Sequence, residues 1–400
     1  MRFPEFSGEW EICKVSELLD FYSTNSLSWE QLEYGEKAMM NLHYGLIHVG
    51  LPTMVDLRRD KLPNVKEGNM PKNFELCKEG DVAFADASED TNEVAKVIEL
   101  FNLDNKDIVC GLHTIHGRDN KNKTIVGFKG YAFSSSAFHN QIRRIAQGTK
   151  IYSISTKNFS ECYVGIPSKA EQTKIATLLR LIDERIATQN KIIEDLKKLK
   201  SAISQHLFSQ EPNVWNRLDN LFVKGKAGGT PISTNKEYYN GNIPFLSIND
   251  ITRQGKYIWL TEKHISLNGL ENSSAWIVPK HSLIMSMYAS VGLVTINQVP
   301  IATSQAMFSM LLRDKSLLDY LYYYLSYFKY RHIHKYLETG TQSNINADIV
   351  SGIMIPDYGY RHNMQIASML QSIDMKIDNE SSILERYSQQ KNDLLSSLFI

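Results

Sequence analysis

The chain has 400 residues, with 44 basic and 44 acidic side chains, no formal net charge and 42% hydrophobic residues. This composition is typical of a globular protein with room for about two to four domains. The zero net charge argues against a protein that coats nucleic acid non-specifically, although it allows a local basic surface. The sequence holds neither a run of about 18 apolar residues that could cross a bilayer nor an apolar signal core. We therefore expect a cytoplasmic protein without membrane attachment.

The four cysteines are scattered and form no CxxC pair: Cys13, Cys77, Cys110 and Cys162. Cytoplasmic proteins rarely form structural disulfides, and metal ribbons need closely spaced pairs. We interpret all four as buried or incidental thiols and expect no metal site.

Residues 1–166 contain short β-rich runs at 81–85, 124–128 and 151–154, and an amphipathic helix is predicted over 92–102. Gly, Asn, Asp and Pro separate these elements, which predicts an α+β globular domain.

Basic and aromatic side chains gather in the second half of this segment, around a Gly-Thr-Lys element at 148–150. Basic residues provide affinity for phosphate, and Arg can also read base edges. Clusters of this kind are often only solvated surface, so both interpretations stand at this point. The candidates for nucleic-acid contact are Arg118, Arg143, Arg144, Lys150 and Tyr152.

A long helix is predicted over residues 167–209. Ser168 can cap its start, and Glu171 completes a capping-box pattern. Apolar residues then recur at alternating spacings of three and four, which is the coiled-coil signature. Gln189 and Lys200 fill the two remaining seam positions. The predicted apolar seam residues are Leu179, Ile182, Ile186, Ile193, Leu196, Ile203 and Leu207.

Residues 210–355 have the same mixed character, with β-rich runs at 243–248, 283–287 and 293–296 and a helix predicted over 317–337. They predict a second α+β domain. A Gly-Gly-Thr-Pro turn at 228–231 either brings its backbone close to a phosphate or is a simple structural turn. The candidates for nucleic-acid contact are Lys226, Thr230, Ser286, Tyr288, Ser290, Lys335, Thr341 and Gln342.

The last segment, 356–400, repeats the first long helix. Residues 366–399 align with 175–208 without a gap, 191 positions later, with 11 identities in 34 positions. Neither helix can bury its apolar stripe alone, so we predict that the two copies pair, although packing of each on its own domain is the alternative. The apolar seam of this copy consists of Leu370, Ile373, Ile377, Leu384, Tyr387, Leu394 and Leu398. Its polar seam positions, Glu380 and Lys391, match Gln189 and Lys200.

Catalytic motifs are missing from the sequence. It contains no phosphate-binding loop, dinucleotide fingerprint, HExxH or GxSxG motif, and no Pro-Pro dipeptide. His332 and His334 are two residues apart on a predicted helix and face different directions, so they are poor joint metal ligands. His113 and His116 favour a structural role or nucleic-acid contact. A nuclease or methyltransferase is the least favoured class.

Taken in order, several segments resemble the specificity subunit of type I restriction–modification enzymes. The similarity extends over nearly the whole chain and rests on the doubled domain-plus-helix layout. Its residues are those at 166–186, 228–231, 243–251, 285–292, 303–307 and 340–356.

The resemblance implies an α+β protein with a pseudo-two-fold internal repeat. Its segments would be target-recognition domain 1 (1–166), a central helix (167–209), target-recognition domain 2 (210–355) and a C-terminal helix (356–400). Each domain would read one half of a bipartite, asymmetric site in double-stranded DNA, and the helices would form an antiparallel coiled coil that sets the spacer. Modification subunits would dock on it and supply S-adenosylmethionine chemistry, while restriction subunits would supply ATP- and Mg-dependent cleavage. The chain itself would be non-catalytic and need no cofactor.

A coiled-coil scaffold that binds only proteins is the alternative from a different class. It would explain the helices and the zero net charge equally well. It would not explain why a basic, aromatic cluster precedes the same Gly-Thr element in both halves.

Overall fold

The computed structural model describes residues 2–35, 39–336 and 344–399. The chain forms two compact units: the first contains Met1–Lys191 and Ser381–Ile400, and the second contains Ile192–Glu380. Both long helices, α6 (Lys169–Phe208) and α11 (Tyr360–Ser397), contribute one part to each unit. The division into four segments at 166, 209 and 355 stays a prediction. No helix in the described part of the chain is long and apolar enough to cross a membrane.

Each unit consists of parts of the two long helices and a globular part, which we call its head. The head of the first unit contains both strands and helices. Its strands are β1 (Glu11–Lys14), β2 (Asp20–Tyr22), β3 (Leu32–Glu33), β4 (Met39–Leu42), β5 (Met54–Asp56), β6 (Asn64–Val65), β7 (Val82–Ala85), β8 (Ala87–Ser88), β9 (Val97–Asn102), β10 (Asp107–Cys110), β11 (Thr114–Arg118), β12 (Tyr152–Ser153) and β13 (Tyr163–Ile166). Its helices are α1 (Val15–Leu18), α2 (Tyr44–His48), α3 (Lys129–Phe133), α4 (Ser136–Ile145) and α5 (Thr156–Ser160).

The head of the second unit also contains both strands and helices. Its strands are β14 (Val214–Arg217), β15 (Phe222–Ala227), β16 (Tyr239–Leu246), β17 (Tyr257–Ile258), β18 (Lys263–Ile265), β19 (Ile277–Val278), β20 (Leu283–Ser286), β21 (Val294–Asn297), β22 (Ile301–Thr303), β23 (Met307–Leu312) and β24 (Met354–Asp357). Its helices are α7 (Ile248–Gln254), α8 (Leu267–Glu271), α9 (Leu318–Arg331) and α10 (Ala347–Ser351).

The five-stranded sheets of the two heads share one topology. The five-stranded sheet has the order β2-β11-β7-β9-β5 in the first head and β15-β23-β20-β21-β17 in the second. In both sheets the last pair is parallel and the other pairs are antiparallel. Each head also has a four-stranded sheet and a two-stranded pair, β1-β13 or β14-β24, that joins its first strand to the strand before a long helix. The duplication therefore includes the heads, which sequence comparison had matched only in short elements.

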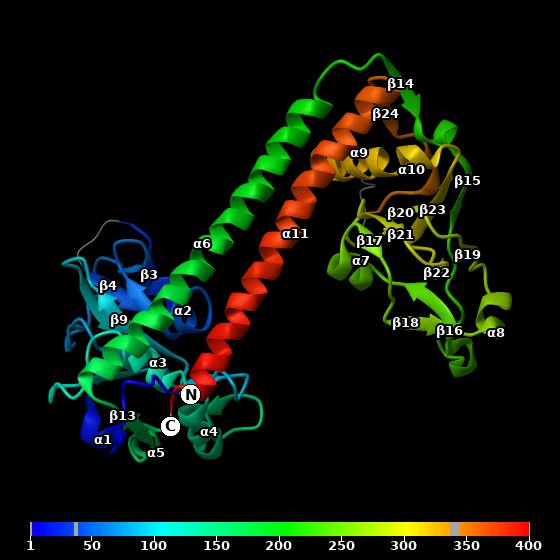
Figure 1. Cartoon of the computed structure of the whole chain (residues 1–400). Helices are drawn as coiled ribbons and strands as arrows, with labels where there is room; N and C mark the ends of the chain where they lie inside the picture. The colour runs from blue at the N-terminus through cyan, green and yellow to red at the C-terminus, as the bar shows by residue number, and fades with distance from the viewer. Residues whose placement is uncertain (1, 36–38, 337–343, 400) are drawn as a thin grey trace. The chain divides into compact units, whose positions relative to one another are not determined.

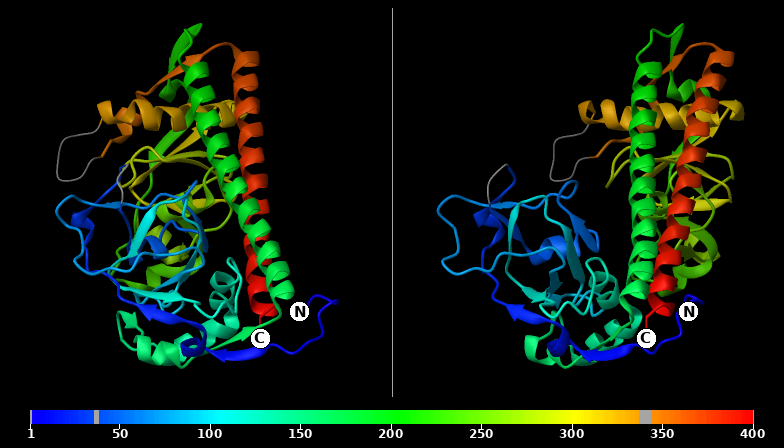
Figure 2. Two further views of the ribbon diagram at one scale, coloured as in Figure 1. Left: turned by 90° about the vertical axis from the view of Figure 1, so that its left-hand side faces the viewer. Right: turned by 60° about the vertical axis from the view of Figure 1, so that its left-hand side comes forward.

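The long helices pair in opposite directions within each unit, and the views in Figures 1 and 2 show them side by side. This confirms the predicted antiparallel coiled coil. All fourteen predicted apolar seam residues are buried or half-buried, and none is exposed. Residues of the long helices and of the segment after α11 also belong to the core of each unit: Leu179 and Phe399 in the first, Leu370 and Phe208 in the second.

One cluster of three polar side chains fixes the helix pair to the first head. Lys391 Nζ of α11 lies 2.6 Å from Asp183 Oδ1 of α6. The hydroxyl of Tyr131, in α3 of the head, donates to Asp183 Oδ2 at 2.8 Å. The lysine ammonium also lies 5.9 Å from the centre of the Tyr131 ring. We call this cluster the first triad.

The second unit contains the same cluster with the roles of the helices exchanged. Lys200 of α6 forms an ion pair with Asp374 of α11, and Tyr323 of α9 donates to Asp374 Oδ2 at 2.9 Å. The lysine ammonium lies 5.3 Å from the Tyr323 ring centre. This is the second triad. Lys200 and Lys391 are the matched polar seam positions, so the polar breaks in the two apolar stripes contribute to the attachment of the heads.

Both tyrosines keep their protons. Burial and the neighbouring carboxylate raise the pKa of Tyr131 and of Tyr323 well above the usual range. Each aspartate is partly removed from water, and the protonated phenol supplies a hydrogen bond that replaces one from water.

The predicted helix at 92–102 is wrong, because 97–102 form the strand β9 inside the five-stranded sheet. A charged residue, Glu99, interrupts the apolar run of this strand. Glu99 is in fact fully buried, with Lys129 Nζ 3.1 Å away. Two backbone amides, those of Gly127 and Gly130, donate to it. A buried charge with several partners can interrupt an apolar strand without facing water.

The predicted strand at 124–128 is also wrong, because this segment forms turns. Side chains rather than a neighbouring strand accept its amide hydrogens. Thr124 N donates to Asp119, and Ile125 N donates to Gln172 at the start of α6.

The predicted cap of the first long helix is half formed. Ser168 Oγ accepts a hydrogen bond from Glu171 N at 3.3 Å. The Glu171 carboxylate is buried and pairs with Arg2 at 2.7 Å and with Trp10 at 3.3 Å. It therefore ties the N-terminal segment to α6 rather than completing a capping box.

We expect Asp183→Asn and Asp374→Asn each to lower the free energy of unfolding by about 1–3 kcal/mol, because the amide cannot balance the partly buried lysine. Urea unfolding followed by circular dichroism measures the change. The control is Asp195→Asn on the exposed face of α6, for which we expect less than about 0.5 kcal/mol. Equal effects at Asp183 and Asp195 would contradict the role of the first triad.

Candidate nucleic-acid interface

Helix α4 presents two of the predicted arginines. Ser135 caps it by accepting a hydrogen bond from Phe138 N at 3.3 Å, and Phe138 and Ile142 bury one face in the core. Arg143 and Arg144 therefore fall on the exposed side of the last turn. Cations are favoured there by the helix dipole.

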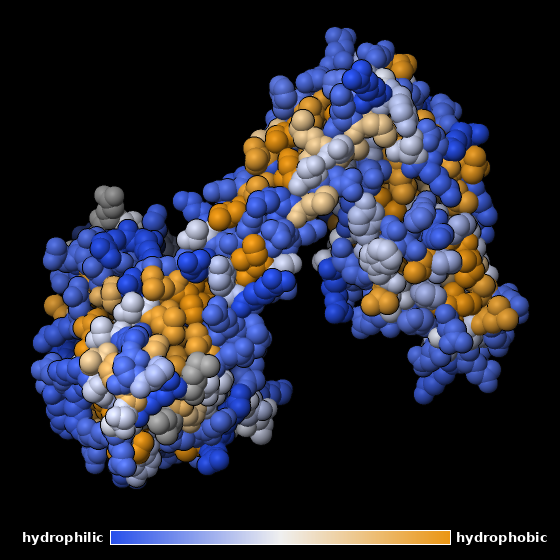
Figure 3. All heavy atoms as spheres, in the orientation of Figure 1, coloured by the Kyte–Doolittle hydropathy of each residue, from blue (hydrophilic) through white to orange (hydrophobic). Residues whose placement is uncertain are grey.

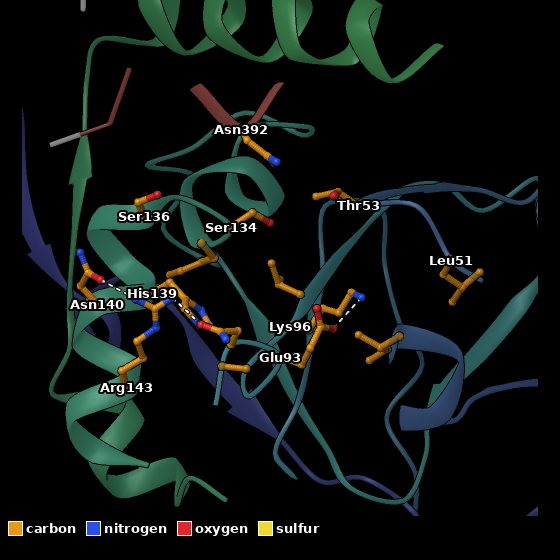
Figure 4. Close-up of a pocket in the computed structure, with 15 residues that line it drawn as sticks. Leu51, Thr53, Glu93, Lys96, Ser134, Ser136, His139, Asn140, Arg143 and Asn392 are labelled. Carbon is orange, nitrogen blue, oxygen red and sulfur yellow. Dashed lines mark hydrogen bonds and ion pairs between the residues drawn. The ribbon is translucent and has the colours of Figure 1, made fainter. Parts of the chain in front are cut away.

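Arg143 lies at the rim of a cavity of about 380 Å³. Its guanidinium donates to Asn92 Oδ1 at 2.5 Å and to Asn140 Oδ1 at 3.2 Å. Figure 4 shows Asn140, His139 and Arg143 on the α4 side of this cavity. Burial lowers the pKa of His139, so this imidazole is neutral at pH 7. Sequence reasoning missed the two asparagines, because single amides carry no pattern.

Lys150 and Tyr152 follow α4 in a tight turn. Gly148 has a φ of +139°, and a Cβ on it would lie 1.9 Å from the carbonyl oxygen of Ile151. Only glycine fits this turn. Lys150 is exposed, while Tyr152 is half-buried and pairs with Ser88 through β12 and β8. Four of the five candidates of this head therefore lie on the end of α4 and on the turn and strand that follow it: Arg143, Arg144, Lys150 and Tyr152.

Arg118, the fifth candidate of this head, lies in the interior. Its guanidinium donates to Asp81 at 2.8 and 2.9 Å and to Glu75 at 2.6 Å, and it lies 4.4 Å from the centre of the Tyr22 ring. It also donates to the Leu76 carbonyl at 2.7 Å. A guanidinium satisfied in this way is not available to DNA, so we exclude Arg118 from the interface.

The glycine turn of the second head is structural. A Cβ on Gly228 would lie 2.0 Å from the Thr303 carbonyl oxygen, and one on Gly229 would lie 2.2 Å from Ser274 Oγ. The amide of Gly228 donates to Met307 O at 3.1 Å, and that of Gly229 donates to Thr303 O at 2.9 Å. Both amides are thus engaged within the protein. This favours the structural interpretation of the turn over phosphate contact.

The loop after β20 is held from inside by Ser286. This side chain is fully buried; its hydroxyl donates to the Ser290 carbonyl at 2.8 Å and accepts from Leu293 N at 2.9 Å. Ala289 and Ser290 both have positive φ values, 41° and 43°, a conformation uncommon for residues other than glycine. The predicted contact residues of this loop differ in role: Tyr288 and Ser290 are exposed, while Ser286 positions them.

Thr230 is linked to this loop through the segment 304–306. Its hydroxyl donates to Gln305, and Met287 N donates to the Ala306 carbonyl at 2.7 Å. Thr230, Gln305 and Tyr288 are all exposed. They form a polar surface with an amide, a hydroxyl and an aromatic ring. Gln305 was not predicted, although its neighbours contributed to the family resemblance.

The remaining candidates of the second head are two lysines, Lys226 and Lys335, together with Thr341 and Gln342. Lys226 is exposed on β15, and Lys335 is exposed just after α9. Gly292, at the end of the Tyr288 loop, lies against Lys329 of α9, since a Cβ on it would be 3.1 Å from Lys329 Cγ. Thr341 and Gln342 lie outside the described residues.

The structure also groups three side chains that sequence spacing had separated. Cys77, Cys110 and His116 are all buried in the first head, and their ligand atoms lie within 4.8 Å of one another. They have the chemistry to hold a soft metal ion. Thiols at these distant positions could not be associated from the sequence alone.

Two segments of the chain, residues 60–198 and 212–386, match the family model described as "Type I restriction modification DNA specificity domain". The chain belongs to this family. The two matches together extend over more than half of the chain. They confirm the family resemblance that the sequence indicated.

Relatives in the family are distant in sequence. The chain is 26% identical to the type I restriction enzyme MjaIX specificity subunit of Methanocaldococcus jannaschii over 43% of this chain and 40% of that protein. It is 33% identical to the HindI specificity subunit of Haemophilus influenzae over 32% of this chain and 28% of that protein. A putative MjaX specificity subunit of M. jannaschii is 24% identical over 98% of this chain and 93% of that protein.

Solved structures of the family share the fold. The S subunit of the type I restriction–modification system from M. genitalium matches with a TM-score of 0.58 and 16% identity, over 100% of this chain and 99% of that one. A chain from a study of complex assembly and conformational transition of the type I R-M system matches with a TM-score of 0.61 and 15% identity, over 98% and 97%.

We expect Gly228→Ala to destabilise the second head by about 1–3 kcal/mol, because the new methyl would collide with the Thr303 backbone. Thermal unfolding measures the effect. Gly8→Ala is the matched control, since no atom lies within 4 Å of its Cβ position. Weakened DNA binding with unchanged stability would instead indicate the phosphate-contact interpretation of the turn.

Proposed function

We propose that this chain is the DNA-recognition subunit of a type I restriction–modification complex, and that each head reads one half of a bipartite, asymmetric site in double-stranded DNA. Both units repeat one five-stranded sheet topology and one triad, yet the exposed side chains of the two heads differ. This observation carries the proposal. A conserved frame with two different surfaces suits two different half-sites.

The first head would contact DNA through the end of α4 and the turn after it. Arg144 and Lys150 are exposed cations suited to phosphates. Arg143 is held in place by Asn92 and Asn140, and a guanidinium with a fixed orientation is suited to bidentate contact with guanine.

The second head would use the surface around Tyr288. Gln305 and Thr230 offer an amide and a hydroxyl at its centre, and amides pair well with adenine edges. Lys226 and Lys335 are exposed cations that would contact phosphates. Ser286 would act only by holding the loop, because it is buried.

Partner subunits would dock on the long helices, which would act as the spacer between half-sites. Their outer faces carry exposed apolar side chains, and Figure 3 shows such residues along the helices. They include Leu181, Ile192 and Leu199 of α6 and Met369 and Met375 of α11. We propose that modification subunits bind here and carry S-adenosylmethionine, and that restriction subunits carry ATP and Mg. This chain would then be non-catalytic and act in the cytoplasm.

Two substitutions test the roles of the heads when the chain is assembled with a modification subunit. We expect Arg144→Ala to weaken binding to all duplexes and to lower the salt slope by about one, because one phosphate contact is lost. We expect Gln305→Ala to relax the preference at one position of one half-site, costing about 1–3 kcal/mol there. Selection from a randomised duplex library at several salt concentrations measures both.

Arg361→Ala, at an exposed position at the start of α11, is the control and should change neither quantity. A change in both half-sites from Gln305→Ala would contradict the assignment of one half-site to each head. If DNA binding by the wild-type chain depended on neither salt nor sequence, the alternative of a scaffold that binds only proteins would be favoured instead.

A further inference from the structure

Three adjacent backbone segments of the first head converge at Cys77, Cys110 and His116. Cys77 N donates to the Ile108 carbonyl of β10 at 2.8 Å, and Cys110 is the last residue of the same strand. His116 lies in the middle of β11, the next strand along the chain. Two strands, and a backbone segment that is hydrogen-bonded to one of them, therefore hold the three side chains in place without any ligand.

The spacing of the ligand atoms fits a metal ion better than a disulfide bond. The two sulfur atoms are 3.6 Å apart. Two thiolates on a tetrahedral zinc ion, each at about 2.3 Å, are roughly 3.8 Å apart, whereas bonded sulfurs are about 2.05 Å apart. A ring nitrogen of His116 lies within 4.8 Å of both sulfurs. Little movement would be needed to close the three ligands on one ion.

Asp81 orients the imidazole for this task. His116 Nε2 lies 2.7 Å from Asp81 Oδ2, so the nitrogen that carries the proton faces the carboxylate. In the neutral ring, His116 Nδ1 is then left with its lone pair, and this atom is buried with no hydrogen-bond partner among the described residues. A ligating histidine commonly donates its other N–H to a carboxylate in this way.

The charges of the cluster balance when a divalent ion is present. Two thiolates and one divalent cation sum to zero, and the imidazole is neutral. The Asp81 carboxylate is paired with the Arg118 guanidinium at 2.8 Å. A neutral set of this kind can stay in the interior, where an unbalanced charge would be costly.

We propose that Cys77, Cys110 and His116 bind one zinc ion inside the first head. Two thiolates and an imidazole are the ligand set that zinc favours, and a solvent molecule can complete the fourth position. The ion would join β10, at the edge of the four-stranded sheet, to β11 of the five-stranded sheet.

One ion per chain is expected. In the second head, β23 has the place that β11 has in the five-stranded sheet, and the strand before it, β22, ends at Thr303, which offers no thiolate. The described residues of that head contain no comparable cluster of ligands.

The test measures metal in the full-length chain, purified without chelators and supplied with Zn²⁺. We expect about one tightly bound zinc per chain by mass spectrometry, and replacement by Co²⁺ should produce a thiolate-to-cobalt absorption band. Cys110→Ser should abolish the band, while Cys162→Ser, at another buried thiol of the same head, should keep it. Asp81→Asn retains the three ligands and should lower zinc affinity about 10–100-fold.

Wild-type protein that retains no zinc and gives no cobalt–thiolate band would overturn the proposal. So would a Cys77–Cys110 disulfide in protein isolated without reductant, detected by peptide mass mapping. Both of these outcomes are measured on the wild-type protein. The proposal can therefore be overturned even if a variant fails to fold. Circular dichroism of Cys110→Ser separates loss of metal from loss of fold.

Discussion

The attachment of each head to the helix pair depends on an aspartate that bonds two partners at once. In each unit the aspartate accepts a hydrogen bond from a tyrosine of the head. It also forms an ion pair with a lysine of the opposite long helix. All three side chains are partly removed from water, so a lost partner leaves a polar group unpaired at a cost of a few kcal/mol. Neither sliding of the helices nor rotation of the head can satisfy all three groups. Coiled-coil register and head placement are therefore fixed by the same atoms.

This arrangement separates what must stay constant from what can vary. Lys200 and Lys391 occupy equivalent seam positions 191 residues apart, and Asp183 and Asp374 are separated by the same 191 residues. The sheets behind the two tyrosines have the same strand order. The exposed loops differ: arginines and a basic turn on one head, and a tyrosine loop beside an amide on the other. Exposed side chains can thus change without disturbing the frame.

The long helices could be predicted from sequence because the alternation of three and four is a local property. The shared topology of the heads could not, since sheets are built from distant segments whose sequences have diverged. Local patterns also misled where buried charges interrupt them. Glu99 made a strand look like an amphipathic helix, and Arg118 appeared to be a surface cation although it bonds Asp81 in the interior.

The cluster of Cys77, Cys110 and His116 illustrates the same limit. The two cysteines are 33 residues apart in the sequence and come together only because the backbone at Cys77 bonds β10. No spacing rule for metal ligands includes such a separation. The sequence also does not show which predicted contact residues are exposed: Ser286, the last residue of β20, is buried, whereas Tyr288, two residues later, faces solvent.

We propose that the paired helices set the separation between the two half-sites. Removing 187–193 and 378–384 together deletes one heptad from each helix and leaves both triads intact. This shortens the pair by about 10.5 Å, or about three base pairs. Methylome sequencing of a host that carries this variant tests the claim most directly. We expect a spacer about three base pairs shorter between two unchanged half-sites. An unchanged spacer, or an altered half-site, would contradict it.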